Sequence, residues 1–460
     1  MSKINANFNL NKRRKIFGKT EVFTFKGGIH PDDMKGSTET KAIVDIEAPA
    51  ELVFPLQQHI GAPAVPCVEV GQRVLMGQKI AEAGGFVSAN IHSSVSGTVK
   101  AIEQRLHPSG TKVQSIVIEN DGLNEVSDEL IPLDEETVSP QEIIERVKAA
   151  GIVGMGGATF PTHVKLSPPA DKKIDYVIIN GAECEPYLTS DHRAMLETTD
   201  EVVRGLRLIL KALAIKDGYI AVETNKQDAI AKLKSCVQSD ADYNIKIVAV
   251  KTKYPQGSEK HLIKAVTGRS VPPGKLPMDV GVVVNNIDTC AAVARAVIQG
   301  KPLIRRIVTV SGDCIAEPLN FRVPIGTPFS HLVEKCGGFS KTAAKLIMGG
   351  PMMGVALSSV DVPVIKGSSG LLAFSEEMAK TQQTASCLRC GKCVSGCPMN
   401  LLPNVIKEAV CADDLEKLTK LNLGDCIQCG SCSYVCPAEQ NPLQYVRTGK
   451  AKLARQEVKA

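Results

Sequence analysis

Eight of the chain's fifteen cysteines lie in two short runs with the same spacing. The first run, CLRCGKCVSGCP, extends from Cys387 to Pro398, and the second, CIQCGSCSYVCP, extends from Cys426 to Pro437. Each has the form C-x-x-C-x-x-C-x-x-x-C-P. Regularly spaced thiols in a reducing compartment bind metals more often than they form disulfides. The two runs therefore predict metal centres.

The spacing favours iron–sulfur clusters over zinc. Structural zinc sites usually join two C-x-x-C pairs across a longer loop, whereas here three cysteines follow one another closely. In the dicluster pattern, the cysteine before the proline binds the other cluster. We therefore expect two [4Fe–4S] clusters with crossed ligands: a first cluster held by Cys387, Cys390, Cys393 and Cys436, and a second held by Cys426, Cys429, Cys432 and Cys397.

The segment between the two runs has apolar residues at near-helical spacing, at Leu401, Val405, Ile406 and Val410. This pattern predicts a helical dicluster domain. The remaining cysteines have no ligand spacing, and buried apolar packing is expected for them. They are Cys67, Cys184, Cys236, Cys290, Cys314, Cys336 and Cys411.

The composition bounds the class of protein. With 460 residues, 43% hydrophobic and 22% charged, the chain is expected to form several globular domains rather than a disordered or fibrous structure. A net charge of +5 is too small to indicate a nucleic-acid-binding protein. The sequence shows neither a signal-peptide pattern nor a run of ~20 apolar residues, so a cytoplasmic location is expected. The basic run from Lys12 to Lys15 is interpreted as a solvated arm rather than a lipid contact.

A glycine-rich turn is the second place where the residues suggest chemistry. Ser139, Pro140 and Glu142 predict the start of a helix that ends near Gly151, and further glycines follow at positions 154, 156 and 157. Thr159 occupies the third glycine position of G-x-G-x-x-G, and a helix precedes the turn, so a standard dinucleotide fingerprint is excluded. A simple turn and a phosphate cradle both remain open, with Lys165 as a candidate phosphate partner.

Strand and helix patterns alternate downstream of this turn. Strands are expected at residues 175–183, 218–224 and 243–252, with helices at 200–215, 226–237 and 258–268. This alternation predicts an α/β sheet whose ligands bind beyond the carboxyl ends of its strands. The polar residues that follow strands are Asn180, Glu183, Glu185, Asn285 and Asn286.

Four segments, GIVGMGGATFPTHVK, INGAECEP, YPQGSEKHLIKAVTG and VVVNNIDT, occur in this order. Together they resemble the flavin and NADH site of the flavoprotein subunit of respiratory complex I, which binds FMN in a fold of its own. The resemblance implies FMN contacts at Gly154, Gly156, Lys165, Asn180, Glu259, Asn285 and Asn286. It implies nicotinamide-nucleotide contacts at Phe160, Glu183 and Glu185, and no covalent catalytic residue. Three positions depart from that family: Met155 replaces Arg, Thr159 replaces Gly and Ala182 replaces Asp.

Two flanking regions are expected to be rich in strands. Residues 68–102 alternate apolar and polar side chains and resemble a biotinyl or lipoyl carrier domain, but the lysine that would carry a prosthetic group is missing between Lys79 and Lys100. A docking module is therefore expected there. IRRIVTVSGDC and LNFRVPIG predict two strands, followed by a helix capped at Thr327 and Pro328. This unit resembles the β-grasp (SLBB) domain of complex I.

The resulting fold class is multidomain α/β and β. We expect an N-terminal arm (1–35), a barrel-sandwich hybrid-like domain (36–130), an FMN/NADH-binding α/β domain (131–300), a β-grasp SLBB-like domain (301–375) and a two-[4Fe–4S] ferredoxin-type domain (376–460). With the opening FKGGIHP, from Phe25 to Pro31, this order resembles the family of C subunits of Rnf complexes. Those complexes are membrane-bound ferredoxin:NAD oxidoreductases that move Na⁺ or H⁺.

This resemblance implies a peripheral subunit on the cytoplasmic face of the membrane. It implies hydride exchange between NAD(H) and FMN, with single electrons passing through the two clusters. The implied partners are the membrane subunits and a ferredoxin-accepting iron–sulfur subunit. A hydride carries two electrons and a cluster accepts one, which is why a flavin must connect them. Two alternatives remain: a soluble cobalamin reductase-like flavoprotein and a non-enzymatic electron wire.

Overall fold

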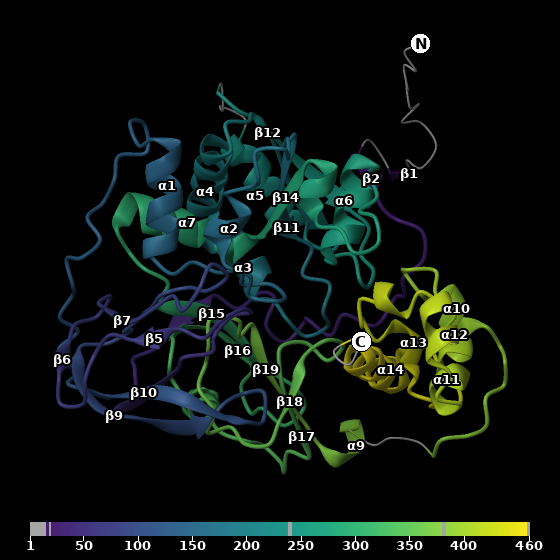
Figure 1. Cartoon of the computed structure of the whole chain (residues 1–460). Helices are drawn as coiled ribbons and strands as arrows, with labels where there is room; N and C mark the ends of the chain where they lie inside the picture. The colour runs from purple at the N-terminus through teal and green to yellow at the C-terminus, as the bar shows by residue number, and fades with distance from the viewer. Residues whose placement is uncertain (1–14, 18–19, 238–241, 380–382, 458–460) are drawn as a thin grey trace.

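The computed structural model describes residues 15–17, 20–237, 242–379 and 383–457, and Figure 1 shows its helices and strands. Within these ranges the chain forms an α/β domain, two β-rich regions and a helical C-terminal domain. Lys12, Arg13 and Arg14 of the basic run lie outside the described residues. The solvated arm therefore stays a prediction for them.

The α/β domain is built on a six-stranded sheet in the order β1-β2-β13-β12-β11-β14. All neighbouring pairs are parallel except β1 and β2. The strands are β1 (Lys15–Phe17), β2 (Thr20–Phe23), β11 (Tyr176–Gly181), β12 (Asp217–Glu223), β13 (Asn244–Val250) and β14 (Val282–Asn286). The helices are α1 (Pro140–Ala149), α2 (Thr162–Lys165), α3 (Ser190–Glu197), α4 (Thr199–Ala212), α5 (Gln227–Val237), α6 (Glu259–Thr267), the 3-10 helix η1 (Pro277–Val280) and α7 (Ile287–Gln299). The alternation expected from the sequence is confirmed.

Helices cover both faces of this sheet because side chains alternate along each strand. Val177 and Ile179 of β11 pack into the core that contains α4 and α7, whereas Ile178 packs with Leu262 of α6 on the other face. Figure 1 shows the same division, with α4 and α7 on one side of the sheet and α6 toward the other. Because the strands are parallel, the polar residues at their carboxyl ends lie along the same edge of the sheet.

The start of α1 follows the sequence prediction closely. Ser139 Oγ accepts a hydrogen bond from the backbone N–H of Glu142, and the Glu142 carboxylate accepts one from the Ser139 N–H over 2.8 Å. The helix ends at Ala149, and Gly151 has a φ of +64°. The short elements β1, β2, α2 and α3 were not expected, because elements of this length leave little periodicity to detect.

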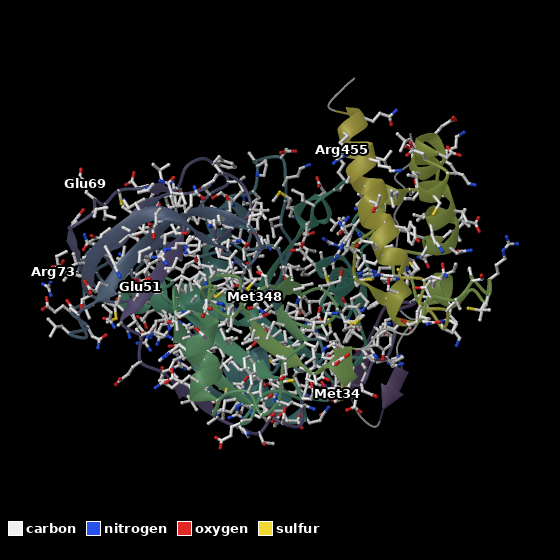
Figure 2. The ribbon with its side chains drawn as sticks, turned by 90° about the horizontal axis from the view of Figure 1, so that it is seen from below. Met34, Glu51, Glu69, Arg73, Met348 and Arg455 are labelled. Carbon is white, nitrogen blue, oxygen red and sulfur yellow. The ribbon has the colours of Figure 1, made fainter. Side chains whose placement is uncertain are left out.

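Two small sheets form the region expected to be a barrel-sandwich domain. One has the order β4-β10-β9-β6 and the other β5-β7-β8. The strands are β4 (Glu51–Pro55), β5 (Val65–Pro66), β6 (Arg73–Val74), β7 (Lys79–Glu82), β8 (Ile91–His92), β9 (Gly97–Leu106) and β10 (Lys112–Asn120). Their buried side chains belong to the same apolar core as α4 and α7. Figure 2 places Glu51, Glu69 and Arg73 at the end of the molecule remote from Arg455.

The third sheet has the order β18-β17-β19-β15-β16-β3. Its elements are β3 (Ile43–Asp45), β15 (Arg305–Ser311), β16 (Leu319–Pro324), α8 (Phe329–Lys335), β17 (Lys345–Met348), β18 (Val355–Leu357), β19 (Gly370–Phe374) and α9 (Glu376–Ala379). The expected cap of α8 was half wrong. Pro328 is the residue before the helix, but it gives no side-chain cap, and the buried Thr327 hydroxyl has no hydrogen-bond partner among the described residues.

The C-terminal domain is helical, as predicted. Its helices are α10 (Lys392–Ser395), α11 (Pro403–Cys411), α12 (Leu415–Lys420), the 3-10 helix η2 (Leu423–Asp425), α13 (Ser431–Tyr434) and α14 (Pro442–Glu457). Leu401, Ile406 and Val410 are buried in its core, as their spacing indicated, whereas Val405 is only partly buried. None of the helices in the described ranges combines the length and apolar character needed to cross a bilayer.

Candidate functional site

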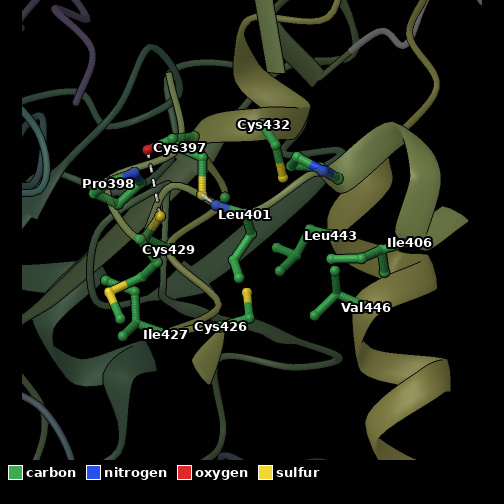
Figure 3. A pocket seen from close by; sticks show the side chains of 14 residues that line it. Cys397, Pro398, Leu401, Ile406, Cys426, Ile427, Cys429, Cys432, Leu443 and Val446 are labelled. Carbon is green, nitrogen blue, oxygen red and sulfur yellow. Dashed lines mark hydrogen bonds between the residues drawn. The ribbon is translucent and has the colours of Figure 1, made fainter. Parts of the chain in front are cut away.

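The two cysteine runs fold around two small cavities, and each cavity takes cysteines from both runs. The first-cluster cavity is lined by Cys387, Cys390, Cys393 and Cys436. The second-cluster cavity is lined by Cys397, Cys426, Cys429 and Cys432. In Figure 3 the four sulfur atoms of the second-cluster cavity surround a common space. The structure therefore brings together the two sets of cysteines that the crossed pattern predicts.

The two runs also repeat one backbone conformation. Arg389 and Gln428, each two residues after the first cysteine of a run, have φ values of 52° and 55°. Gly391 and Gly430 follow with φ values of 74° and 79°. Each run then enters a short helix, α10 or α13, and leads to a longer helix that begins with proline. The shared spacing thus produces two copies of the same local fold.

The sulfur environment suits thiolate-bound clusters. Three backbone N–H groups donate to cysteine sulfurs over 3.4 Å: Leu401 to Cys397, Gln440 to Cys436 and Gln428 to Cys426. Such hydrogen bonds stabilise sulfur charge and help to set cluster potentials. Burial raises the pKa of the Cys432 thiol to about 12, so metal binding there has to displace a proton. In the described part of the chain no three His, Cys, Asp or Glu side chains are close enough to hold a single metal ion. The sulfurs instead surround each cavity, an arrangement that fits a multi-iron cluster.

The surroundings of the two cavities differ. Cys387 and Cys390 of the first-cluster cavity are exposed, and Leu388 between them is 67% exposed. Cys397 and Cys429 of the second-cluster cavity are buried. The wall of the second-cluster cavity is apolar and includes Leu401, Ile406, Leu443 and Val446 (Figure 3).

The expected flavin residues gather at the carboxyl edge of the α/β sheet. Asn180 of β11 and Asn286 of β14 are paired positions on adjacent parallel strands. The glycine loop, residues 151–161, lies against them, and a Cβ added to Gly156 would be 3.0 Å from Asn286 Nδ2. Glycine at position 156 therefore lets the loop backbone come close to this edge.

Lys165 and Glu259 lie at the same edge. Lys165 Nζ donates to Glu259 Oε1 over 3.2 Å and to the Val284 carbonyl over 2.9 Å. Asn180 Nδ2 donates to the Gly257 carbonyl over 2.8 Å, which ties the loop before α6 to β11. The Lys165 side chain is 25% exposed, so its charge is accessible to an anion such as a flavin phosphate.

The glycine loop is closed by its own backbone and held at its base. Gly154 N donates to the Phe160 carbonyl over 2.8 Å, and Met155 N donates to Thr289 Oγ1 of α7 over 2.9 Å. Thr159 has a φ of +52°, which is rare for a β-branched residue. The backbone at this position thus keeps the conformation that glycine favours, although the side chain is threonine.

Sequence reasoning missed a buried arginine that supports this loop from β15. Arg306, 2% exposed, donates to the Met155 carbonyl over 3.3 Å and to Met155 Sδ over 2.7 Å. It also forms an ion pair with Asp288 of α7, which in turn accepts a hydrogen bond from Arg295. The only signal in the sequence was a pair of arginines at the start of a largely buried strand.

Several buried polar groups at or beside this edge have no hydrogen-bond partner among the described residues. They are Asn285 Nδ2, Thr162 Oγ1, and both Oε1 and Nε2 of Gln256. Gln256 is fully buried beside Gly257, and sequence reasoning did not single it out. Unpartnered buried groups are rare in folded proteins and often face a ligand or water. Asn285 follows Val284, whose carbonyl accepts from Lys165, and Gln256 precedes Gly257, whose carbonyl accepts from Asn180. This placement fits a ligand rich in hydrogen-bonding atoms, such as FMN.

The three residues expected at the nicotinamide nucleotide are placed differently from one another. Phe160 lies on the glycine loop, where it is partly buried. The Glu183 carboxylate accepts hydrogen bonds from the N–H groups of Asp191 and His192 at the start of α3. The Glu185 carboxylate accepts them from Met352 and Met353, over 3.0 and 2.9 Å. Both carboxylates are thus already paired with backbone groups.

The cysteines outside the two runs only partly follow the expectation of buried packing. Cys290, Cys314 and Cys336 are buried, and Cys184 and Cys236 are partly buried. For Cys67 and Cys411 the expectation was wrong, because both are exposed. Cys67 directly follows β5, and Cys411 is the last residue of α11.

Four domain families match the chain in succession. Residues 23–123 match the RnfC barrel sandwich hybrid domain, and residues 147–295 match the Nuo51 FMN-binding domain. Residues 307–356 match the SLBB domain, and residues 386–440 match the 4Fe-4S dicluster domain. The glycine loop and the paired asparagines fall in the second of these, and all eight cluster cysteines fall in the last.

Curated relatives match nearly the whole chain. The C subunit of the Na(+)-translocating ferredoxin:NAD(+) oxidoreductase complex of Acetobacterium woodii is 47% identical over 94% of this chain and 98% of that protein. The C subunit of the proton-translocating ferredoxin:NAD(+) oxidoreductase complex of Clostridium ljungdahlii is 48% identical over 92% and 93%. The C subunit of an ion-translocating oxidoreductase complex of Rhodobacter capsulatus is 45% identical over 89% and 79%.

Among solved structures, a chain of an NAD+-reducing [NiFe]-hydrogenase in the air-oxidized state shares the fold. It has a TM-score of 0.50 at 19% identity, with 69% of this chain and 66% of that chain covered. Because the identity is low, this likeness concerns architecture alone.

Proposed function

Because the chain belongs to the family of C subunits of ion-translocating ferredoxin:NAD(+) oxidoreductase complexes, we propose that it is the subunit where NAD(H) exchanges electrons with FMN and two [4Fe–4S] clusters. One observation carries this proposal: a single chain holds both the polar flavin edge and two four-cysteine cavities. The cobalamin reductase-like and electron-wire alternatives are not favoured by the relatives.

When bound, FMN would supply the exchange between the two-electron hydride of NADH and the single electrons of the clusters. The chain's own residues bind and orient. Lys165 and the loop N–H groups around Gly156 would neutralise and hold the flavin phosphate. Gly154, whose own N–H donates to the Phe160 carbonyl, would shape the loop around the flavin. Asn180, Asn285, Asn286 and Glu259 would contact the rest of the cofactor.

Gln256 is a further candidate for flavin contact. Its amide is fully buried and neither of its polar atoms has a partner in the described residues. An amide that offers both a donor and an acceptor can match the alternating polar atoms of an isoalloxazine edge. This role would offset the cost of keeping both groups unpaired.

Phe160, Glu183 and Glu185 remain the proposed nicotinamide-nucleotide residues. Phe160 is carried by the glycine loop, close to the proposed flavin phosphate contacts. For Glu185 to contact a nucleotide, the 350–353 loop would have to release it, because that loop now donates two N–H groups to its carboxylate. The Glu183 carboxylate accepts hydrogen bonds from N–H groups in the first turn of α3, so it would affect the nucleotide by positioning this helix.

We also propose the cellular setting. The chain would be a peripheral subunit on the cytoplasmic face of the membrane, attached through other members of the complex. A ferredoxin-accepting iron–sulfur subunit would exchange electrons with it, and ion movement would belong to membrane subunits. The relatives named for Na⁺ and for proton translocation are almost equally identical to this chain, so the ion is left open.

The test is anaerobic purification followed by cofactor and electron assays. We expect about eight iron atoms, a matching amount of sulfide and one FMN per chain. Addition of NADH should reduce the clusters, seen as new electron paramagnetic resonance signals. Zinc in place of iron, or clusters that dithionite reduces but NADH does not, would contradict the proposal.

A further inference from the structure

The segment FKGGIHP, residues 25–31, has no part in the function described so far. It follows β2, and in Figure 1 it descends beside the C-terminal helices. Phe25 and Ile29 are each 6% exposed, so the segment is packed rather than loosely attached. The segment lies between the α/β domain and the C-terminal domain, and its contacts with each are described below.

One side of the segment is bound to the α/β domain. Ile29 and Tyr254 exchange two backbone hydrogen bonds of 2.8 and 2.9 Å. Lys253 Nζ donates to the Gly27 carbonyl over 3.0 Å and lies 3.5 Å from the centre of the Phe25 ring. The same ring is 4.5 Å from the ring of His261 on α6.

The other side of the segment faces the loop of the second-cluster cavity. Gly27 has a φ of +87°, and a Cβ there would be 3.2 Å from the Cys397 carbonyl oxygen. A Cβ added to Gly396 would be 3.1 Å from Ile29 Cγ2. Glycine is needed at both positions for this close approach. The segment therefore touches the chain on either side of a proposed cluster ligand.

Two side chains of the α/β domain reach the same cavity directly. Tyr254 Oη donates to the Cys429 carbonyl over 2.7 Å. His261 Nε2 donates to the Pro398 carbonyl over 3.0 Å, while its Nδ1 lies 2.9 Å from Ser258 Oγ. The carbonyl partner requires a proton on Nε2. Both bonds thus end on residues that are, or directly follow, cysteines of the second-cluster cavity.

An apolar cluster completes this junction. Ile29, Tyr254 and Cys429 are buried together, with Cys184, Met352, Ile427 and Val435 packed around them. The 350–354 loop joins from the third sheet, since a Cβ on Gly430 would be 3.2 Å from the Met352 carbonyl oxygen. Of these residues, Ile427, Cys429 and Gly430 line the second-cluster cavity, whereas Val435 directly precedes Cys436 of the first-cluster cavity.

We propose that Gly27, Ile29, Tyr254 and His261, here called the clasp, are positioning residues that hold the second-cluster cavity against the flavin domain. The cluster of Cys397, Cys426, Cys429 and Cys432 is then the one that exchanges electrons with the flavin. The exposed first-cluster cavity is the one that exchanges them with a partner. This inference rests on the proposed function, because it assigns an order to cofactors that the proposed function requires.

The physical reason is precision of placement. Carbonyl oxygens on a short ligand loop are fixed when buried donors bind them, and a site needs such support to keep its geometry. A misplacement of about 1 Å can slow a reaction on the order of a hundredfold.

The electrons in the proposed transfer balance. NADH becomes NAD⁺ and H⁺, and each of the two clusters gains one electron.

The order of the clusters is tested with Cys390→Ser and Cys429→Ser in the full anaerobic chain. In Cys390→Ser, NADH should still reduce the surviving second cluster at close to the wild-type rate. In Cys429→Ser, NADH should reduce the surviving first cluster at least a hundredfold more slowly, although dithionite reduces it fully. The opposite pattern, or equal rates in the two variants, would overturn the inference. A wild-type chain whose clusters ignore NADH would instead contradict the proposed function.

The clasp itself is tested with Tyr254→Phe, with Tyr219→Phe as the matched control. Tyr219 packs against Tyr176 on the sheet and is remote from the cavity contacts. Tyr254→Phe should keep its iron and FMN, but hydrogen exchange at residues 396–401 and 427–432 should rise at least tenfold, with slower cluster reduction by NADH. Gly27→Ala should act in the same direction, while Gly36→Ala, where a Cβ meets open space, should not. Unchanged exchange in both clasp variants would refute the role.

Discussion

The two cluster cavities have the same cysteine spacing and the same local backbone, yet they occupy different environments. The first-cluster cavity has exposed cysteines and an exposed Leu388, whereas the second-cluster cavity is buried behind apolar side chains and the clasp. Spacing therefore specifies which sulfurs meet, and the neighbouring domains decide which cavity is accessible. Two copies of one motif can thus place one cluster in a buried site and the other in an exposed site.

The largest expected effect concerns the crossed ligands. Cys436→Ala should abolish the first cluster although Cys436 belongs to the second run, and iron should fall from about eight to about four atoms per chain. The control is a comparison of paramagnetic resonance spectra. Cys436→Ala should match Cys387→Ala and differ from Cys426→Ala. A match to Cys426→Ala would show that each run holds its own cluster.

The next effect concerns the apolar wall that distinguishes the cavities. Ile406 is fully buried in the second-cluster cavity wall, so Ile406→Ala should destabilise the C-terminal domain by about 2–5 kcal/mol through lost contacts and a new void. The exposed Leu388 lines the first-cluster cavity, and Leu388→Ala should change stability by less than about 0.5 kcal/mol. Denaturant titration followed by cluster absorbance measures both. Equal losses of stability in the two variants would contradict the expected difference between a buried and an exposed cavity wall.

Glu185, which accepts hydrogen bonds from the loop of residues 350–354 beside the second-cluster cavity, gives a pH-dependent prediction. Burial raises the pKa of Glu185 to about 7, although the N–H donors of Met352 and Met353 oppose this. Its folded pKa exceeds its unfolded value, so its contribution is most favourable below the unfolded pKa and is lost as pH rises through about 7. Glu185→Gln imitates the protonated form.

The difference between this variant and wild type should therefore grow with pH. Above pH 7 the variant should be more stable by up to about 3 kcal/mol, and the gain should shrink as pH falls toward the ordinary carboxyl range. Thermal unfolding at a series of pH values measures the difference. A gain that is the same at every pH would mean that Glu185 does not titrate in this range. Glu136, on an exposed loop, provides the control as Glu136→Gln.

The smallest effect concerns the carboxyl edge of the α/β sheet, where the flavin is proposed to bind. This edge differs from both cavities because it offers a charged lysine side chain rather than cysteine thiols. Lys165→Ala should weaken FMN binding about ten- to a hundredfold, the cost of one charge-assisted hydrogen bond. Lys173→Ala is the control, because the Lys173 side chain is 91% exposed and far more solvated. Flavin fluorescence during reconstitution reports the affinity, and iron content should not change. Equal affinities would remove Lys165 from the flavin site.

Much of the α/β domain could be predicted because its strands and helices are long enough to show their periods. The capping box of Ser139 and Glu142 marked α1, and the parallel register brought Asn180 and Asn286 together as expected. By contrast, β2 and β3 could not be predicted as members of their sheets. Each pairs with a strand more than 200 residues away, β2 with β13 and β3 with β16. Pairing between such distant segments leaves no local trace in a sequence.

The site shows the same division. Lys165, Glu259 and Gly156 were expected to contact the flavin, and the structure places them at the carboxyl edge of the sheet. Their contacts with the flavin stay a prediction. Arg306 and Gln256 were missed, because their importance lies in burial and in missing or distant partners rather than in any pattern. Glu183 and Glu185 were expected to face a nucleotide, whereas backbone N–H groups of other segments already bind them.

The sequence by itself determined the kind of metal centre, since ligand number and spacing are properties of a short stretch of chain. It also predicted the crossed sets of cysteines, and each cavity is lined by three cysteines of one run and the last cysteine of the other. Only the tertiary structure decided which cavity meets the flavin domain. That choice depends on Gly27, Tyr254 and His261, which come from separate parts of the chain and contact Cys397, Cys429 and Pro398 only after the domains have packed.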